Sequence, residues 1–388
     1  MTIKGKACIA GVFEHPTRKA VDKSVVQLHA EVAQGALADA GLSKHDVDAY
    51  YCAGDAPGLG PLSMVDYLGL KVRHIDSTDV GGSSYLVHVG HAAQAIAAGK
   101  CNVALITLAG RPRAEGQATG TAPRNFGATA DTPFEFPFGP ATANMYAMAA
   151  MRHMHEYGTT SEQLAWIRVA ASHHAQHNPH AMLRELVTVE DVVNSPLIAD
   201  PLHRLDCCVV SDGGGALIVT RPEIARSLNR PVVKILGAGE AVKGQMGGKV
   251  DLTYSGAAWS GPLAFEEAGV KPADIQYASI YDSFTITVLM QLEDLGFCKK
   301  GEGGKFVSDG NLISGVGKLP INTDGGGLCN NHPSNRGGMT KVIEAVRQLR
   351  GEAHPAVQVR DCGLALAHGT GGSLGSRHGS ATLILGKE

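Results

Sequence analysis

The feature that most constrains this chain is a helix–glycine–turn–strand unit that occurs twice, about half a chain apart. The first copy spans residues 38–50 (Ala-Asp-Ala-Gly-Leu-Ser-Lys-His-Asp-Val-Asp-Ala-Tyr), and the second spans residues 266–277 (Glu-Glu-Ala-Gly-Val-Lys-Pro-Ala-Asp-Ile-Gln-Tyr). In each copy a helix ends at a glycine, and a short turn leads into a strand. A repeat at this spacing predicts two duplicated halves rather than a solenoid, whose periods are about 20–50 residues.

Strand-like and helix-like segments alternate through both halves, which predicts an α/β fold with largely buried sheets. Expected strands are 7–12, 47–52, 103–108, 232–236, 275–280 and 380–385, and expected helices are 24–40, 81–98, 257–268 and 340–349. We place an N-terminal half at residues 1–225 and a C-terminal half at residues 226–388. The segment of about residues 110–195 differs in character from the rest of the two halves, because a stretch rich in Gly, Pro and Thr precedes a helical, histidine-rich part. We interpret it as an inserted loop and helical lid.

Composition excludes several classes of function. The 388 residues carry a net charge of −3 with no dominant basic stretch, so nucleic acid is not an expected ligand. The 8 cysteines include no Cys-x-x-Cys pair, and the N-terminus shows no apolar leader, so neither a structural zinc site nor disulfides are expected. No apolar run of about 18 residues occurs, so no membrane span is expected. These features predict a reducing, aqueous compartment such as the cytoplasm.

Residues 322–333 (Asn-Thr-Asp-Gly-Gly-Gly-Leu-Cys-Asn-Asn-His-Pro) form the strongest local signal. A glycine run followed by His-Pro, and then by a Gly-Gly-Met helix start, would present one imidazole on a rigid loop. The segment resembles the Asn-x-x-Gly-Gly-x-x-x-x-Gly-His-Pro motif of thiolases, with Asn331 in place of the last glycine. The resemblance implies that His332 activates a nucleophile or helps to hold a thioester oxygen.

Other motifs extend the resemblance over nearly the whole chain. Residues 178–181 (Asn-Pro-His-Ala), 200–208 (Asp-Pro-Leu-His-Arg-Leu-Asp-Cys-Cys) and 211–215 (Ser-Asp-Gly-Gly-Gly) resemble thiolases of the sterol-carrier-protein type. Residues 281–284 (Tyr-Asp-Ser-Phe) match that group's His-Asp-Cys-Phe, and residues 367–372 (Ala-His-Gly-Thr-Gly-Gly) resemble its Gln-His-Asn-x-Gly-x-Gly-Gly. We interpret the 211–215 segment as a structural turn between the halves.

This resemblance implies the thiolase fold, a duplicated five-layered α-β-α-β-α core with helices 81–98 and 340–349 at its centre. It also implies an acyl-CoA thioester as substrate, carbon–carbon bond formation or cleavage of the acyltransferase class, and no tightly bound cofactor or metal. A homodimer is expected, both from the family and because the apolar strand 103–108 would otherwise be an exposed edge. The resemblance also implies an alternative. Some thiolase-like proteins that lack the nucleophilic cysteine are retro-aldolases, and they are paired with a small zinc-ribbon/OB-fold protein.

The cysteines of the thiolase reaction are missing from their expected positions. Thiolases place the nucleophile at the start of the helix that ends here at Gly99, where the helix dipole would lower the pKa of a thiol. Counting back from Gly99 by the spacing found in the family places the nucleophile position at Gly82, next to Ser83. The second, acid–base cysteine falls on Ser283 by one motif and on His368 by the other.

Two mechanisms therefore stay open. Ser83 could be the nucleophile if His332 activates it, because a serine hydroxyl needs an adjacent base; an engineered Cys-to-Ser change there is a further alternative. Otherwise no acyl-enzyme forms, and His332, His368 and a phenol (Tyr281, Tyr254 or Tyr85) transfer protons around the bound acyl-CoA. The candidate catalytic set is His332, His368, Ser83, Tyr281, Asp282 and Ser283. The loops expected to bind the CoA thioester carry Gly82, Asn322, Gly325, Gly326, Gly371 and Gly372.

The remaining histidines and arginines carry weaker signals. His88 and His91 share one helix face and could be a metal pair, although packing or a dimer contact is the preferred interpretation. The histidines of residues 173–177 are expected to face solvent. Arg111, Arg113 and Arg124 could meet the CoA phosphates or lie in a solvated loop. There are two alternatives to an acyl-CoA enzyme: a catalytically silent subunit that binds acyl-CoA or lipid, and an unrelated α/β enzyme. The two retained imidazoles favour the acyl-CoA enzyme.

Overall fold

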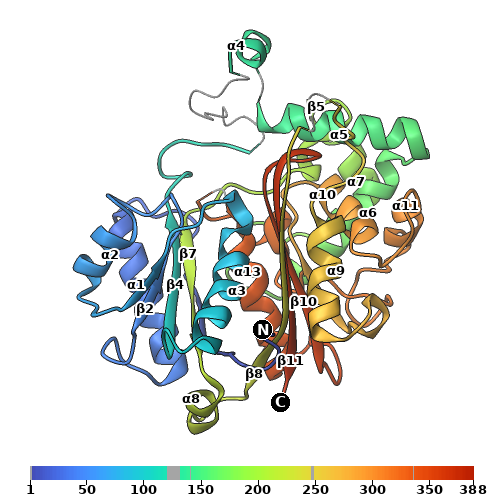
Figure 1. Cartoon of the computed structure of the whole chain (residues 1–388). Coiled ribbons are helices and arrows are strands. Elements are labelled where there is room, and N and C mark those ends of the chain that lie inside the picture. The colour runs from blue at the N-terminus through green and yellow to red at the C-terminus, as the bar shows by residue number, and fades with distance from the viewer. Residues whose placement is uncertain (1, 120–131, 140, 246–248, 335) are drawn as a thin grey trace.

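The computed structural model describes residues 2–119, 132–139, 141–245, 249–334 and 336–388 (Figure 1). Within them, the main sheet has nine strands in the order β3-β2-β4-β7-β1-β8-β11-β10-β9. The strands are β1 (Cys8–Glu14), β2 (Ala49–Tyr51), β3 (His74–Asp76), β4 (Val103–Gly110), β7 (Gly213–Thr220), β8 (Val233–Lys243), β9 (Tyr277–Ile280), β10 (Leu364–Ser373) and β11 (Ser376–Lys387), with a separate pair β5 (Leu197–Ala199) and β6 (Leu202–His203). The helices are α1 (Val25–Ala40), α2 (Pro61–Leu68), α3 (Ser84–Ala97), α4 (Thr132–Glu135), α5 (Thr142–Tyr157), α6 (Ser161–Ala175), α7 (Val189–Val193), α8 (Pro222–Ser227), α9 (Ala257–Ala268), α10 (Thr285–Asp294), α11 (Gly303–Val307), α12 (Gly326–Cys329) and α13 (Gly338–Arg350).

The strand order separates the two halves of the chain. Strands β3-β2-β4-β7-β1 come from the first half and β8-β11-β10-β9 from the second. The two sets meet where β1 pairs with β8 at Cys8–Lys234 and Ile9–Val233. The repeated glycines cap α1 and α9 in the same way, because Gly41 (φ 70°) and Gly269 (φ 68°) both adopt the left-handed conformation that favours glycine. The boundary at residue 225 stays a prediction.

Helices form three layers around the two sets of strands. Helices α3 and α13 lie between the sets and contact both, since α3 packs on β4 and β8, and α13 packs on β1 and β10 (Figure 1). Helix α1 covers the other face of the first set, and α9 covers β8 and β11 of the second. This α-β-α-β-α order confirms the predicted fold class and the central position of helices 81–98 and 340–349.

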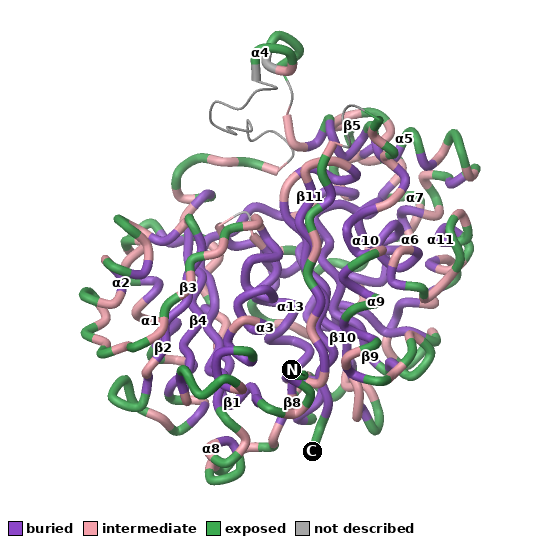
Figure 2. Tube along the Cα trace, viewed as in Figure 1, coloured by how far each residue is buried: buried purple, intermediate pink, exposed green. Residues whose placement is uncertain are grey.

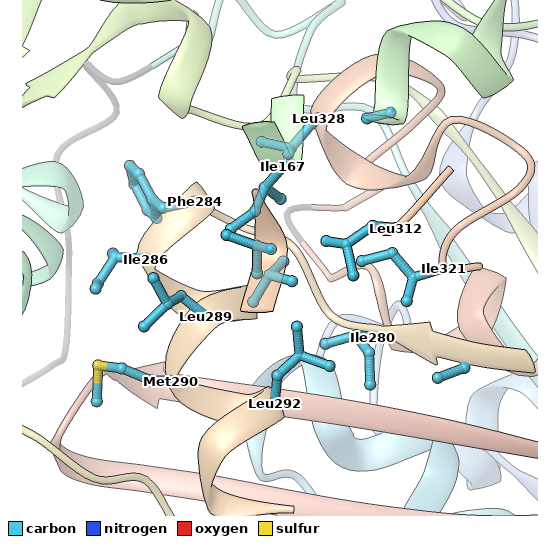
Figure 3. Close-up of a cluster of buried hydrophobic side chains, with 14 of the residues drawn as sticks. Ile167, Ile280, Phe284, Ile286, Leu289, Met290, Leu292, Leu312, Ile321 and Leu328 are labelled. Carbon is cyan, nitrogen blue, oxygen red and sulfur yellow. The ribbon is translucent and has the colours of Figure 1, made fainter. Parts of the chain in front are cut away.

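Burial explains why these layers hold together. The central layer is almost wholly buried (Figure 2). Even the charged residues Lys341 and Glu344 on α13 are buried. The second half has a further apolar core around Ile280, Leu289 and Leu292 (Figure 3). This core supports the segment between β9 and α10, which carries several of the candidate site residues.

Three expectations about local structure are wrong. Residues 103–108 lie in β4, an interior strand between β2 and β7, whereas β3 and β9 are the two edges of the sheet. Residues 367–372 lie in strand β10 rather than in a loop, and residues 213–215 begin strand β7 rather than forming a turn between the halves. Glycine is a turn signal in a sequence, but here it permits close packing: a Cβ at Gly371 would overlap the carbonyl oxygen of Val80.

The predicted insertion packs on the second half of the molecule. Helix α6 contacts α10, α11 and α12, and α5 contacts α10 and β10 (Figure 1). Residues 120–131 and 140 of the Gly/Pro/Thr-rich stretch, including Arg124, lie outside the described residues. Across the described ranges, no helix has both the length and the apolar content needed to cross a membrane.

Candidate active site

A cavity of about 400 Å³ lies where four motif-bearing segments meet. They are the turn leading into α3, residues 281–284 between β9 and α10, the segment carrying His332, Ser334 and Arg336, and the end of β10. The walls are completed by the start of α5 and by residues 207–210. The lining includes Gly81, Gly82, Tyr146, Cys207, Cys208, Tyr281, Ser283, Phe284, His332, Ser334, Arg336, Thr370, Gly371 and Gly372.

A phenol and an imidazole form the central pair of this cavity. His332 Nε2 lies 2.8 Å from Tyr281 Oη, and the Gly337 N–H donates to the same phenol oxygen at 3.1 Å. Both side chains are buried. Desolvation lowers the pKa of His332 to about 4 and raises the pKa of Tyr281 well above its usual value. At neutral pH the hydrogen bond therefore joins two uncharged groups that can exchange a proton.

Gly82 explains why no nucleophile stands at the start of α3. A Cβ at this position would overlap the Tyr281 phenol oxygen and would lie 2.5 Å from the Thr370 carbonyl oxygen. The Tyr281 hydroxyl thus occupies the space that any side chain at position 82 would need. The observed position of the Tyr281 phenol therefore requires a glycine at position 82.

Ser83 is not arranged as a nucleophile. Its hydroxyl is buried and donates to the Val80 carbonyl oxygen at 2.8 Å, and Ser83 does not line the cavity. Cys207 and Cys208, which the sequence analysis did not select, do line it. Burial raises the pKa of the Cys207 thiol to about 12 and raises that of Cys208 further. A buried thiol with a raised pKa offers little thiolate for covalent catalysis.

Asp282 and Asn322 connect the segments that form the site through hydrogen bonds. The Asp282 carboxylate accepts the N–H groups of Gly327 and Leu328 at 2.8 and 3.2 Å and lies 2.7 Å from Lys341 Nζ. The Asn322 amide accepts from the Ile280 N–H and donates to the Ile280 carbonyl oxygen, both at 2.8 Å. Neither side chain lines the cavity.

The loop that carries His332 is anchored at further points. The His332 N–H donates to Ser211 Oγ at 2.9 Å. Asn331, which replaces the motif glycine, donates from its amide to the Glu14 carboxylate at 2.5 Å. Gly325 (φ 96°) and Gly326 (φ 61°) adopt the left-handed conformation, and a Cβ on Gly326 would overlap the Asp282 carboxylate. The glycine run therefore serves close packing of this loop around Asp282.

The structure does not bring the His368 side chain into the cavity. His368 lies on β10, and its Nδ1 is 2.9 Å from Thr382 Oγ1 on β11, which in turn bonds to Ser260 on α9. Burial lowers the pKa of His368 to about 3. Its backbone carbonyl contributes instead, because it accepts the N–H of Tyr281 at 3.0 Å. Gly371 and Gly372, from the same motif, do line the cavity, and the Ser283 hydroxyl lies 3.1 Å from Thr287 Oγ1 at its wall.

The other candidate phenols and the paired helix histidines lie elsewhere. Tyr85 donates to the Asp55 carboxylate, and the ring of Tyr254 stacks under Lys243 Nζ. His88 is buried against the Thr78 carbonyl oxygen, and His91 bonds to Asp76 and Glu240. Over the described part of the chain, no group of three His, Cys, Asp or Glu side chains is placed to hold a metal.

The remaining histidine and arginine candidates divide between core and surface. His174 is buried and accepts the Ser314 N–H at 2.9 Å, so the expectation that residues 173–177 face solvent is wrong for this residue. It lies on the inner face of α6, which packs against the second half. Arg111 donates to the Ala20 carbonyl oxygen, whereas Arg113 lines a second, larger cavity.

That second cavity measures about 920 Å³ and shares Gln117, Ala118, Cys207, Cys208 and Val210 with the first. A further missed residue, Arg336, lines the smaller cavity and is paired with Asp79 at 2.6 Å. Nothing in the local sequence marks Arg336, because its place at the cavity arises from contacts with distant segments. Cys208 lies in the 200–208 motif, which gave no sign that the thiol lines a cavity.

Comparison with known proteins identifies the family of this chain. The family model described as thiolase C-terminal domain-like matches residues 239–387. The chain is 36% identical to the 17-hydroxy-3-oxo-4-pregnene-20-carboxyl-CoA lyase of Mycobacterium tuberculosis, over 90% of this chain and 92% of the relative. It is 33% identical to the acetyl-CoA acetyltransferase of Methanothermobacter thermautotrophicus, over 95% and 97%.

A solved structure named Ltp2-ChsH2(DUF35) aldolase is similar over 99% of this chain and 98% of its own, with 35% identity and a TM-score of 0.88. Relatives this similar over nearly their whole length share its fold. This chain belongs to the thiolase superfamily, in its sterol-carrier-protein type, and is a thiolase-like enzyme.

Proposed function

We propose that this protein cleaves a carbon–carbon bond in a β-hydroxyacyl-CoA by a retro-aldol reaction that needs no acyl-enzyme. The observation that carries the proposal is the pairing of Gly82 with Tyr281. The phenol fills the space of the missing nucleophile and is hydrogen-bonded to His332. The retro-aldol reaction needs a group that removes a hydroxyl proton, and it does not need a nucleophile that attacks the thioester.

In this mechanism Tyr281 and His332 act as one proton-transfer unit. The β-hydroxyl of the substrate gives its proton to the phenol oxygen while the phenol proton passes to His332 Nε2. The bond between the α and β carbons breaks, its electrons form the enolate of the shortened acyl-CoA, and the β carbon becomes a carbonyl. The proton returns to the α carbon, so the products are a ketone or aldehyde and a saturated acyl-CoA, with no net oxidation.

The environment of the pair supports these roles. The lowered pKa of His332 keeps its imidazole a proton acceptor at neutral pH. The Gly337 N–H would stabilise negative charge on the phenol oxygen during the transfer. Gly81 and Gly82, in the turn that leads into α3, line the same cavity, and the positive end of the α3 dipole there favours an enolate. Asp282, Asn322 and Ser211 are proposed as positioning residues.

Acyl transfer is the second candidate, because one close relative bears the name of an acetyl-CoA acetyltransferase. It would need a covalent acyl-enzyme on Ser83 or on a cavity cysteine. The Ser83 hydroxyl is bonded to a carbonyl oxygen rather than to an imidazole, and burial raises the pKa of both cavity thiols. These contacts favour the retro-aldol reaction.

The decisive experiment combines product analysis with three variants. The purified protein is incubated with 17-hydroxy-3-oxo-4-pregnene-20-carboxyl-CoA, the compound in a relative's name, and products are identified by mass spectrometry. We expect Tyr281→Phe and His332→Ala to lose at least about a thousandfold in turnover, within the range for a removed proton-transfer group. Ser83→Ala should keep most activity, and Tyr254→Phe is the matched control. A stable acyl adduct on intact protein, together with an inactive Ser83→Ala, would instead establish acyl transfer.

We also propose an assembly with other chains. The related aldolase structure carries a DUF35 component in its name, which supports the small zinc-ribbon/OB-fold partner that the family resemblance implies. The edge strand β3, with a half-exposed Ile75, supports a homodimer. Light scattering of the chain alone and with a candidate partner tests both proposals, and a monomer across micromolar concentrations would contradict the dimer. A cytoplasmic location remains part of the proposal, as does the absence of a tightly bound cofactor.

A further inference from the structure

The larger cavity contains a buried arginine with no acidic partner among the residues that the structure describes. Arg168, on α6, is 2% exposed and lines this cavity. Its Nη1 donates to the Leu328 carbonyl oxygen, while its Nε has no hydrogen-bond partner in the described part of the chain. Removing a guanidinium from water without a counter-charge is costly, so buried arginines are normally paired.

Two other arginines of low exposure follow that rule. Arg350 is buried and lies 2.9 Å from the Asp39 carboxylate, and Arg336, in the neighbouring cavity, is paired with Asp79. Around Arg168 the other charged residues lining the cavity are Arg113, Arg184, Arg204 and Glu185. Four guanidinium groups and one carboxylate thus face one space, and the innermost guanidinium has no acidic partner among the described residues.

We propose that this cavity is a binding site for a phosphate-class oxyanion, with Arg168 at its floor and Arg184 and Arg204 nearer its exposed rim. A guanidinium offers its donors in a fixed fork that matches phosphate oxygens. The site is continuous with the Tyr281 cavity, because Cys207, Cys208 and Val210 line both. Resting on the proposed function, the anion is a phosphate of the CoA moiety, so the nucleotide lies on the α6 side and the acyl group at Tyr281.

Binding measurements without turnover test this site. Calorimetry with the full chain uses three probes: inorganic phosphate, coenzyme A and pantetheine, which lacks the nucleotide phosphates. We expect Arg168→Gln to weaken coenzyme A and phosphate at least about tenfold and to leave pantetheine unchanged, as fits a lost charged hydrogen bond. Arg221→Gln, which changes an exposed arginine outside both cavities, is the matched control.

The outcomes separate the two sources of phosphate. Weaker phosphate binding with unchanged coenzyme A binding would support a free-phosphate site and remove the CoA assignment. Unchanged affinity of Arg168→Gln for both ligands would overturn the proposal. If Arg168→Gln does not fold, Arg204→Gln is measured in its place, and the melting temperature of the wild-type protein must rise with phosphate more than with chloride of equal ionic strength. The absence of that rise would also overturn the site.

These results are independent of the reaction at Tyr281. Tyr281→Phe should bind coenzyme A as tightly as the wild-type protein, because the phenol is not part of the phosphate site. A failed retro-aldol assay with intact Arg168-dependent binding would therefore refute the proposed function alone.

Discussion

Breaking the buried ion pair between Asp282 and Lys341 should strongly destabilise the protein. The two charged atoms are 2.7 Å apart, and both side chains are 1% exposed. Asp282 also accepts two backbone N–H groups from α12, the short helix that precedes His332. Lys341→Met removes the cation and leaves the carboxylate buried, and such a loss costs about 3–5 kcal/mol of unfolding free energy.

A double-mutant cycle in urea unfolding measures this effect. Lys341→Met should lose about 3–5 kcal/mol, whereas Asp282→Asn combined with Lys341→Met should recover most of it, because no unpaired charge remains. The exposed pair Arg152–Glu156, at 3.0 Å, is the matched control, and Arg152→Met should cost about 0.5 kcal/mol or less. A loss below about 1 kcal/mol for Lys341→Met, or no recovery in the double variant, would refute the reasoning.

Three further predictions concern the cavity, the pH and the sheet edge. Gly82→Ala should lower turnover at least about tenfold and lower the free energy of unfolding by about 1–3 kcal/mol, because the new Cβ needs the space of the Tyr281 phenol. Gly244→Ala, where a Cβ meets nothing within 4 Å, is the control. Full activity of Gly82→Ala would contradict this packing. The folded-state pKa of His332, about 4, lies below its ordinary 6.5, so its contribution to stability is complete above pH 6.5 and is lost as the pH falls toward 4. His332→Asn should therefore lose less stability than the wild-type protein between these pH values in urea titrations, and equal losses would argue against a buried neutral imidazole. Ile75→Lys, on the exposed edge strand, should shift the protein from dimer to monomer in light scattering, and an unchanged dimer would place the interface elsewhere.

Much of the fold could be predicted from local patterns. The repeated unit, in which a helix ends at Gly41 or Gly269, indicated duplicated halves, since a glycine after an apolar helix and before a strand marks a helix end without any long-range information. Glycine as a local signal was misleading at residues 367–372, which were expected in a loop, because these glycines lie inside β10. Their purpose is close approach to the turn before α3, a contact between segments that are distant in sequence.

The candidate site divides in the same way. The sequence by itself determined the duplicated α/β architecture, the glycine-held loop that presents His332, and the absence of a cysteine at position 82, because each is a matter of residue identity and spacing. Only the tertiary structure decided that the Tyr281 phenol fills the space beside position 82 and that the His368 side chain lies outside the cavity. It also decided that Arg168 is buried without an acidic partner among the described residues. The physical reason is that burial and pairing depend on which distant segments meet in the central layer, and no local pattern encodes that meeting.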